Sequence, residues 1–151
     1  MDKVTAKGII KRFEKIMNMK EDDYLIVHEV ADCYETSRKL INHAMMNYRE
    51  ELTSDGAEVL RYGKMKKFKR EANEDDYDPA VYSSFSSMYS LTVFPRKAVI
   101  RLGMVTKKSE VATLVRNYMS SIEAGMDAED KRELVVEIIE NFIDKVNGVT
   151  E

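Results

Sequence analysis

The chain has 151 residues, of which 44% are hydrophobic and 34% are charged. These values predict one domain with an accessory element, a substantial core and a heavily charged surface. No run approaches the roughly 18 apolar residues of a membrane helix, and the amphipathic start is typical of mature protein rather than of a signal peptide. One cysteine, Cys33, allows neither an internal disulfide nor a cysteine metal cluster. We therefore expect a reducing compartment, the cytoplasm, and no membrane partner.

The net charge of −3 is unevenly distributed along the chain. From residue 122 onward nine acidic residues, Glu151 among them, stand against three basic ones, which gives this tail a charge of −6. Residues 1–121 therefore carry +3. A basic body with an acidic tail is compatible with nucleic-acid binding even though the overall charge is negative.

In chain order, the first predicted element is a helix over about residues 4–18, where apolar residues recur at helical spacing. A short apolar step at 25–27 follows, and residues 28–52 then contain two apolar-periodic runs. Gly56 marks a turn, and residues 57–60 fit either a strand or a helix start. Residues 61–70 are strongly basic, whereas residues 71–79 are acidic with little to bury and are predicted to form an exposed loop.

The second half begins with a β-prone stretch over 83–94, in which apolar residues alternate with Ser and Thr. Pro95 predicts the start of a helix that Gly103 ends. Ser109 is a predicted N-cap of the next helix, which Gly125 closes, and Asp127 caps the last helix. The sequence thus predicts a mainly α fold with a small β-sheet, of the α+β class.

Residues 28–52 have the pattern of a helix-turn-helix unit. Ala31 supplies the small residue where two helices cross, and apolar residues occupy the inward positions at Val30, Tyr34, Ile41 and Ala44. Ser37 can cap the second helix, over residues 37–48, and leave its positive end near a phosphate. The residues predicted to contact DNA are Ser37, Arg38, Lys39, Asn42, His43 and Asn47, with Met46 on the same face.

One residue departs from this pattern. The turn position four after Ala31, usually glycine, is Glu35. Either the turn has a different geometry, or Glu35 adopts a strained conformation. Taken alone, the stretch is equally compatible with an ordinary helical hairpin whose polar face is solvated.

A basic run lies about a dozen residues after the predicted recognition helix, where a winged helix-turn-helix places further elements that contact the DNA backbone. Such phosphate contacts set affinity and salt dependence. The alternative is a solvated face that the acidic residues 74–78 neutralise. The helix-turn-helix pattern and the basic run both indicate DNA binding, so the sequence favours phosphate contact. The cations are Arg61, Lys64, Lys66, Lys67, Lys69 and Arg70.

A family resemblance adds to this interpretation. The stretch "SLTVFPRKAVIRLGMVTKKSEVATLVRNYM" resembles a block found in phage antirepressor-type (BRO-type and KilA-type) regulators of Firmicute phages and mobile elements. Those regulators carry a stretch similar to residues 24–37 before it, and the resemblance covers about residues 22–122. It implies DNA binding and regulation of a phage or plasmid programme, and it does not extend to the acidic loop or the last helix.

Within that block, apolar residues are expected to build the core on which the predicted helix-turn-helix packs: Val99, Leu102, Val111, Leu114, Val115 and Tyr118. Three cations, Arg96, Lys97 and Arg101, could support phosphate contacts. Arg116 suits an internal ion pair equally well.

Motifs for catalysis are missing from the sequence. His28-Glu29 lacks the second histidine of a zinc protease, and the glycines are isolated rather than grouped in a phosphate-binding loop. A single cysteine near a single histidine is normally a core residue. We therefore expect no enzyme activity, no metal and no cofactor.

The sequence thus predicts a winged helix-turn-helix-like domain over residues 1–125 and a C-terminal amphipathic helix over 126–151. The predicted function is sequence-specific regulation through double-stranded DNA. The alternative is a protein-binding modulator, an antirepressor or host-factor binder that uses the helix-turn-helix only as scaffold. The last helix either docks on the body or forms a homodimer through Val135, Ile139, Phe142 and Val146.

Overall fold

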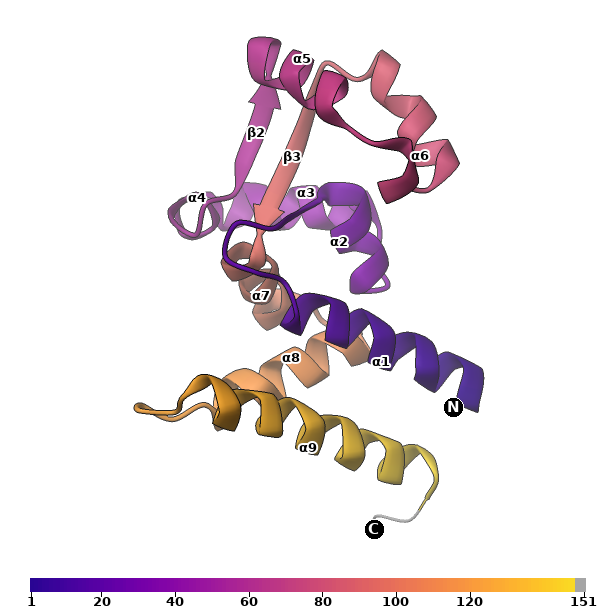
Figure 1. Ribbon diagram of the computed structural model, residues 1–151, viewed down its shortest axis with the longest axis vertical. Helices are drawn as coiled ribbons and strands as arrows, with labels where there is room; N and C mark the ends of the chain where they lie inside the picture. Colours follow the sequence, from indigo (N-terminus) through magenta and orange to yellow (C-terminus); the bar gives the residue numbers. More distant parts are fainter. Residues whose placement is uncertain (149–151) are drawn as a thin grey trace.

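The computed structural model describes residues 1–148, so Glu151 of the acidic tail lies outside the described residues. Within this range, nine α-helices, two 3-10 turns and three strands form a mainly helical α+β architecture (Figure 1). The elements are α1 (Lys3–Met17), β1 (Tyr24–Ile26), α2 (Val27–Cys33), α3 (Arg38–Asn47), α4 (Arg49–Ser54), β2 (Glu58–Arg61), α5 (Tyr62–Glu71), η1 (Glu74–Asp76), α6 (Pro79–Ser84), η2 (Phe85–Ser87), β3 (Ser90–Pro95), α7 (Arg96–Val105), α8 (Glu110–Ser121) and α9 (Ala128–Val146).

The sheet is antiparallel with the strand order β1-β3-β2, so the last strand in sequence lies between the other two. Leu25 lies opposite Phe94, and Arg61 lies opposite Ser90. Side chains alternate along β3 because successive residues of a strand face opposite sides. Leu91 and Val93 are accordingly buried, whereas Ser90 is exposed. The predicted small sheet is confirmed.

The helices begin where the sequence places capping residues. The Ser37 hydroxyl accepts a hydrogen bond from the Leu40 amide at 3.2 Å, and the Ser109 hydroxyl accepts one from Ala112 at 3.1 Å. The Asp127 carboxylate accepts one from an amide in the first turn of α9 at 2.8 Å. Each contact satisfies a backbone donor that the first turn would leave unpaired. All three predicted N-caps are confirmed.

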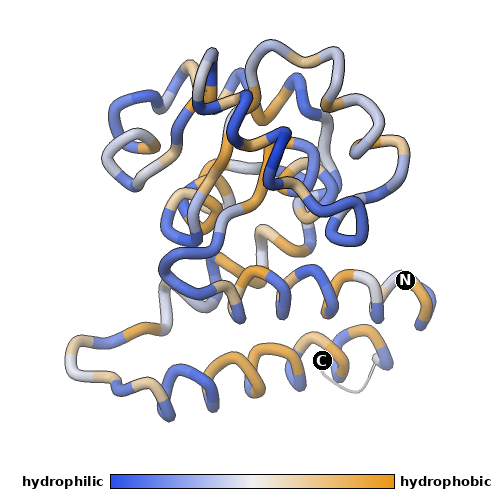
Figure 2. Tube along the Cα trace, turned by 45° about the horizontal axis from the view of Figure 1, so that its top comes forward, coloured by the Kyte–Doolittle hydropathy of each residue, from blue (hydrophilic) through white to orange (hydrophobic). Residues whose placement is uncertain are grey.

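The last helix docks on the body. α9 lies beside α1 and packs on α1 and α8, and apolar residues recur along it (Figure 2). Its inward stripe consists of Leu134, Ile138 and Phe142, of which Phe142 is only 6% exposed. This stripe therefore docks on the body. Phe142, which was predicted to lie in a dimer interface, is a core residue instead. The other three predicted dimer residues, Val135, Ile139 and Val146, are partly buried against the same core.

Residues 62–89 form an insertion between β2 and β3 that gathers at the far end of these two strands (Figure 1). The insertion has a small aromatic core in which Tyr77 meets Phe85 edge to face, with ring centroids 5.0 Å apart. Phe68 joins it at 5.1 Å from Phe85. Residues 71–79 are exposed as predicted except for Ala72 and Tyr77, which are partly buried, and Tyr77 ties the segment to α5 and η2.

Helix α7 continues past Gly103, which was predicted to end it, and stops at Val105. Gly103 lies where α7 meets Tyr34, the residue that follows α2. The buried Tyr34 hydroxyl donates a 2.6 Å hydrogen bond to the Val99 carbonyl, and a Cβ on Gly103 would lie 2.6 Å from that hydroxyl oxygen. Glycine is required here by this close approach rather than by a helix end.

Candidate nucleic-acid interface

Helices α2 and α3 are joined by a short turn that backbone hydrogen bonds close. The Thr36 amide donates to the Ala31 carbonyl at 2.9 Å, and the Glu35 amide donates to the Asp32 carbonyl at 3.1 Å. This pair of bonds is the Schellman ending of a helix, which needs a left-handed residue between the two. Glu35 takes that conformation with φ of 54°. The second alternative therefore holds: Glu35 adopts a strained, left-handed conformation.

The inward residues of this unit are where the pattern placed them. Val30, Ala31, Tyr34 and Ile41 are buried, and Ala44 is partly buried against the core. The outward face of α3 is solvent-exposed along its whole length. Its exposed residues are Ser37, Arg38, Lys39, Asn42, His43, Met46 and Asn47, the complete set that the sequence assigned to this helix.

Arg38 is held in place by a residue of α2. Its Nη1 lies 2.7 Å from Nε2 of His28, which therefore accepts the hydrogen bond. The other ring nitrogen, Nδ1, is buried and has no hydrogen-bond partner within residues 1–148. Burial, with a smaller effect of the Arg38 charge, lowers the pKa of His28. The neutral ring thus orients the guanidinium at the start of α3.

A groove of about 820 Å³ separates the N-terminal half of α3 from β3. One wall carries Arg38, Asn42 and His43, and the other carries Ser90 and Thr92. Neither Ser90 nor Thr92 was among the residues predicted to contact DNA. Their alternation with buried Leu91 is the signal that would place both on the polar face of a strand. The groove joins the outward face of α3 to the polar face of β3.

The basic run forms α5 and the residue before it. Arg61, Lys64, Lys66, Lys67 and Arg70 are exposed, and Lys69 is partly buried. Two of these six cations are engaged locally: Lys64 pairs with Glu58, and Lys69 reaches the Ser86 carbonyl at 3.5 Å.

The predicted alternative was neutralisation of this run by residues 74–78. Among residues 1–148, none of the ion pairs joins α5 to that acidic segment. The exposed cations Arg61, Lys66, Lys67 and Arg70 therefore remain open to solvent.

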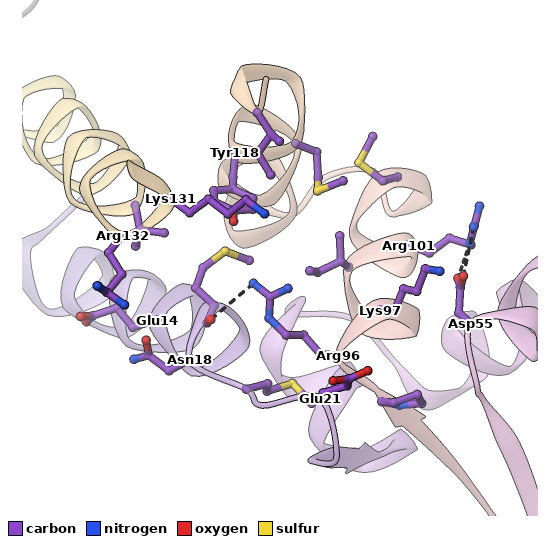
Figure 3. Close-up of a pocket in the computed structure, with 18 of the residues that line it drawn as sticks. Glu14, Asn18, Glu21, Asp55, Arg96, Lys97, Arg101, Tyr118, Lys131 and Arg132 are labelled. Atoms are coloured by element: carbon purple, nitrogen blue, oxygen red, sulfur yellow. Dashed lines mark hydrogen bonds and ion pairs between the residues drawn. The ribbon is translucent and has the colours of Figure 1, made fainter. Parts of the chain in front are cut away.

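The cations of the second block serve the fold instead. Arg116 donates to the carbonyls of Gly103 and Thr106 at 3.0 and 2.7 Å, and so caps the end of α7. Arg101 pairs with the buried carboxylate of Asp55, and Arg96 reaches the Met17 carbonyl at 3.4 Å (Figure 3). These three arginines are thus structural, and Lys97 is the exposed member of the set.

A second, larger groove of about 1570 Å³ is lined by residues of α1, α7, α8 and α9, part of which Figure 3 shows. Apolar residues of α7, α8 and α9 line it, among them Met104, Met119 and Ile139. Charged residues of both signs, including Glu14 and Arg132, surround them. Met104 and Met119 are 46% and 38% exposed, so this face leaves apolar surface open to solvent.

Cys33 is buried at the end of α2, and burial raises the pKa of its thiol to about 11. A protonated, buried thiol is a core group rather than a nucleophile. Within residues 1–148, no group of three or more His, Cys, Asp or Glu residues is placed to hold a metal ion. No helix in this range combines the length and apolar character needed to cross a bilayer.

The chain was compared with protein-family models, with curated proteins and with solved structures, and none of these comparisons gives a match.

Proposed function

We propose that the protein is a winged helix-turn-helix regulator that binds double-stranded DNA, with α3 in the major groove. The observation that carries this proposal is the outward face of α3. It is polar and exposed, its N-terminus is capped by Ser37, and Arg38 is oriented by His28. A helix of this kind can enter the major groove and present Arg and Asn to base edges.

The topology supports the proposal. Helix α1, strand β1, helices α2 and α3, and strands β2 and β3 follow in the order of a winged helix, with the first strand paired to the third. Helix α4 and residues 62–89 are additions, and the insertion occupies the position of the wing. The exposed cations of α5 would then contact backbone phosphates beside the site of α3.

The resemblance to phage antirepressor-type regulators supports the same function and suggests its context. On this proposal the protein acts in the cytoplasm on a phage or plasmid operator. Base contacts from Arg38 and Asn42 would provide sequence preference, and Lys66 and Lys67 would provide affinity independent of sequence.

The test is gel-shift titration against fragments of the native locus at two salt concentrations. Arg38→Ala with Asn42→Ala should weaken binding to the preferred fragment by about tenfold or more, because a good bidentate base contact contributes about 1–3 kcal/mol. The matched control is Lys145→Ala with Asn141→Ala, an exposed pair on α9. Equal binding by both double variants would show that α3 does not read the sequence.

Lys66→Ala with Lys67→Ala should weaken binding to all fragments and reduce the slope of log affinity against log salt by about 1–2. Lys3→Ala with Lys7→Ala removes the same charge from the exposed face of α1 and is the control. Absence of any binding at low salt would reject the DNA proposal. The alternative, a modulator that binds a repressor or host protein, would then be the better hypothesis.

We further propose that two copies pair through the outer face of α9. Besides the docked stripe, α9 exposes two further apolar residues seven positions apart, Val136 at 53% and Ile143 at 39%. Exposed Arg132 lies one turn before Val136, and exposed Glu140 lies one turn after it. Antiparallel pairing of two copies centred on Val136 would bring each Arg132 to the partner's Glu140, which makes the face complementary to itself.

Light scattering in solution tests this pairing. Val136→Glu should reduce the molar mass from two chains to one, since it places a charge in the seam. Arg132→Glu should weaken the dimer, and Arg132→Glu combined with Glu140→Arg should restore it because the unlike charges are then exchanged. A one-chain mass for the unchanged protein at high micromolar concentration, or failure of the exchange to restore the dimer, would exclude this arrangement.

A further inference from the structure

Two tyrosines stand almost completely in solvent at the open end of the β2–β3 hairpin. Tyr62 is 89% exposed and Tyr89 is 92% exposed. They directly flank the last residue pair of the hairpin, Arg61 opposite Ser90. Single exposed apolar residues are common on protein surfaces, but two fully exposed aromatic rings at the same point of the fold indicate a contact surface.

The backbone at Tyr62 is strained. Its φ of 52° lies in the left-handed region, which is unfavourable for a bulky side chain. The ring gains no burial that would offset this cost, and the flexible Gly63 is the next residue. Strain of this kind persists where the surrounding fold imposes it and is concentrated at functional sites. Here it accompanies the abrupt change from β2 to α5 that leaves the ring projecting.

The tip adjoins the candidate DNA interface. Met88 and Ser90, on either side of Tyr89, both line the groove beside α3. Arg61 is exposed and lies opposite Ser90, and directly opposed residues of an antiparallel pair project to the same side of a sheet. Exposed cations of α5 continue from this point, namely Lys66, Lys67 and Arg70.

The chemistry of this surface is a combination of positive charge and open aromatic faces. Cations hold phosphates, and aromatic rings stack on bases that have left the base stack or insert at an opened step. A protein partner would instead be expected to meet a broader apolar patch with charges at its margin.

We propose that the tip stacks Tyr62 and Tyr89 on bases at an opened or kinked step of the DNA, next to the site contacted by α3. This inference rests on the proposed DNA-binding function and adds to it a second mode of contact, one that reads how easily the duplex opens rather than its base edges. Arg61 would hold the adjacent phosphate.

The experiment compares two probes, a 30-base-pair duplex of mixed sequence and the same duplex with a central two-base mismatch whose bases are already unstacked. The unchanged protein should bind the mismatched duplex about tenfold tighter or more, because stacking on a ring contributes about tenfold or more for each base. Tyr62→Ala with Tyr89→Ala should remove this preference, whereas Tyr62→Phe with Tyr89→Phe should keep it.

Three outcomes would overturn the inference. The alanine pair could bind both duplexes like the unchanged protein. The phenylalanine pair could behave like the alanine pair, which would assign the contact to the hydroxyl groups rather than to the ring faces. Binding of neither probe at low salt would reject the proposed function itself, and with it this inference.

Thermal unfolding separates a loss of contact from a loss of fold. Tyr62→Gly removes both the ring and the backbone strain, so its melting temperature should be no lower than that of the unchanged protein. If this well-folded variant keeps the full preference for mismatched DNA, Tyr62 does not stack.

Discussion

Replacement of Gly103 by alanine should disrupt the contact between Tyr34, which follows α2, and α7. The added Cβ would lie 2.6 Å from the Tyr34 hydroxyl oxygen and 2.9 Å from Cγ1 of Val115. Both neighbours are buried, and Tyr34 is completely buried, so the side chains have little room to move. The hydroxyl would be displaced from the Val99 carbonyl, to which it donates at 2.6 Å.

The magnitude follows from two costs and one gain. Overpacking of a core by one methyl group costs about 1–3 kcal/mol. A buried hydroxyl without its hydrogen bond costs about 1–3 kcal/mol. Alanine in a helix interior returns about 0.5–1 kcal/mol relative to glycine. The net expected loss of unfolding free energy is about 3 kcal/mol, which corresponds to a melting temperature lower by about 10 °C.

The assay is urea unfolding followed by circular dichroism, in a double-mutant cycle. Tyr34→Phe alone should cost about 1 kcal/mol, since it removes one buried hydrogen bond. The double variant Gly103→Ala, Tyr34→Phe should lose less unfolding free energy than the sum of the two single variants, by about 1 kcal/mol or more. The reason is that the hydroxyl oxygen 2.6 Å from the added Cβ is then absent.

The control is Gly63→Ala in α5, where no described atom lies within 4 Å of the added Cβ. This change should leave the free energy of unfolding unchanged or raise it by up to about 1 kcal/mol. If Gly103→Ala stays within about 0.5 kcal/mol of the unchanged protein, or if the two changes add, then the close approach of Tyr34 is not what requires glycine at 103.

Three further changes test other parts of the molecule. Glu35→Gly should raise the unfolding free energy by about 0.5 kcal/mol, as relief of the left-handed strain exceeds the entropy cost of glycine; a loss in urea unfolding would contradict the strain argument. Because burial lowers the pKa of His28, the unfolding free energy should fall as pH decreases through about 6.5, where the unfolded chain takes up the proton first. His28→Gln should flatten this pH dependence. If the urea midpoint of the variant varies with pH as that of the unchanged protein does, His28 is not the cause. Asp127→Ala should lower the unfolding free energy by about 1 kcal/mol through loss of the α9 cap, whereas an unaltered thermal midpoint would mean that the cap contributes nothing.

The residues of the candidate interface were largely accessible from the sequence, because they depend on local patterns. Helical spacing of apolar residues identified the inward side of α3, and this placed Arg38, Asn42 and His43 outward. Ser37, Ser109 and Asp127 were found as caps because a cap contacts amides only two or three residues away. The tyrosines at the hairpin tip were missed, since Tyr89 was assigned to the alternation of the strand.

Only the tertiary structure decided which residues meet across the chain. Tyr34 and Gly103 are distant in sequence, so a glycine that looked like a helix end is a packing requirement. Arg101 was expected to support phosphate contacts, and the sequence left Arg116 open between phosphate and an internal ion pair; their partners, Asp55 and the end of α7, decided both. The inward position of Phe142 likewise depends on α1 and α8. Local hydrogen bonds and amphipathic spacing depend on residues that are neighbours in the sequence. Burial and pairing between distant segments depend on how the whole chain packs.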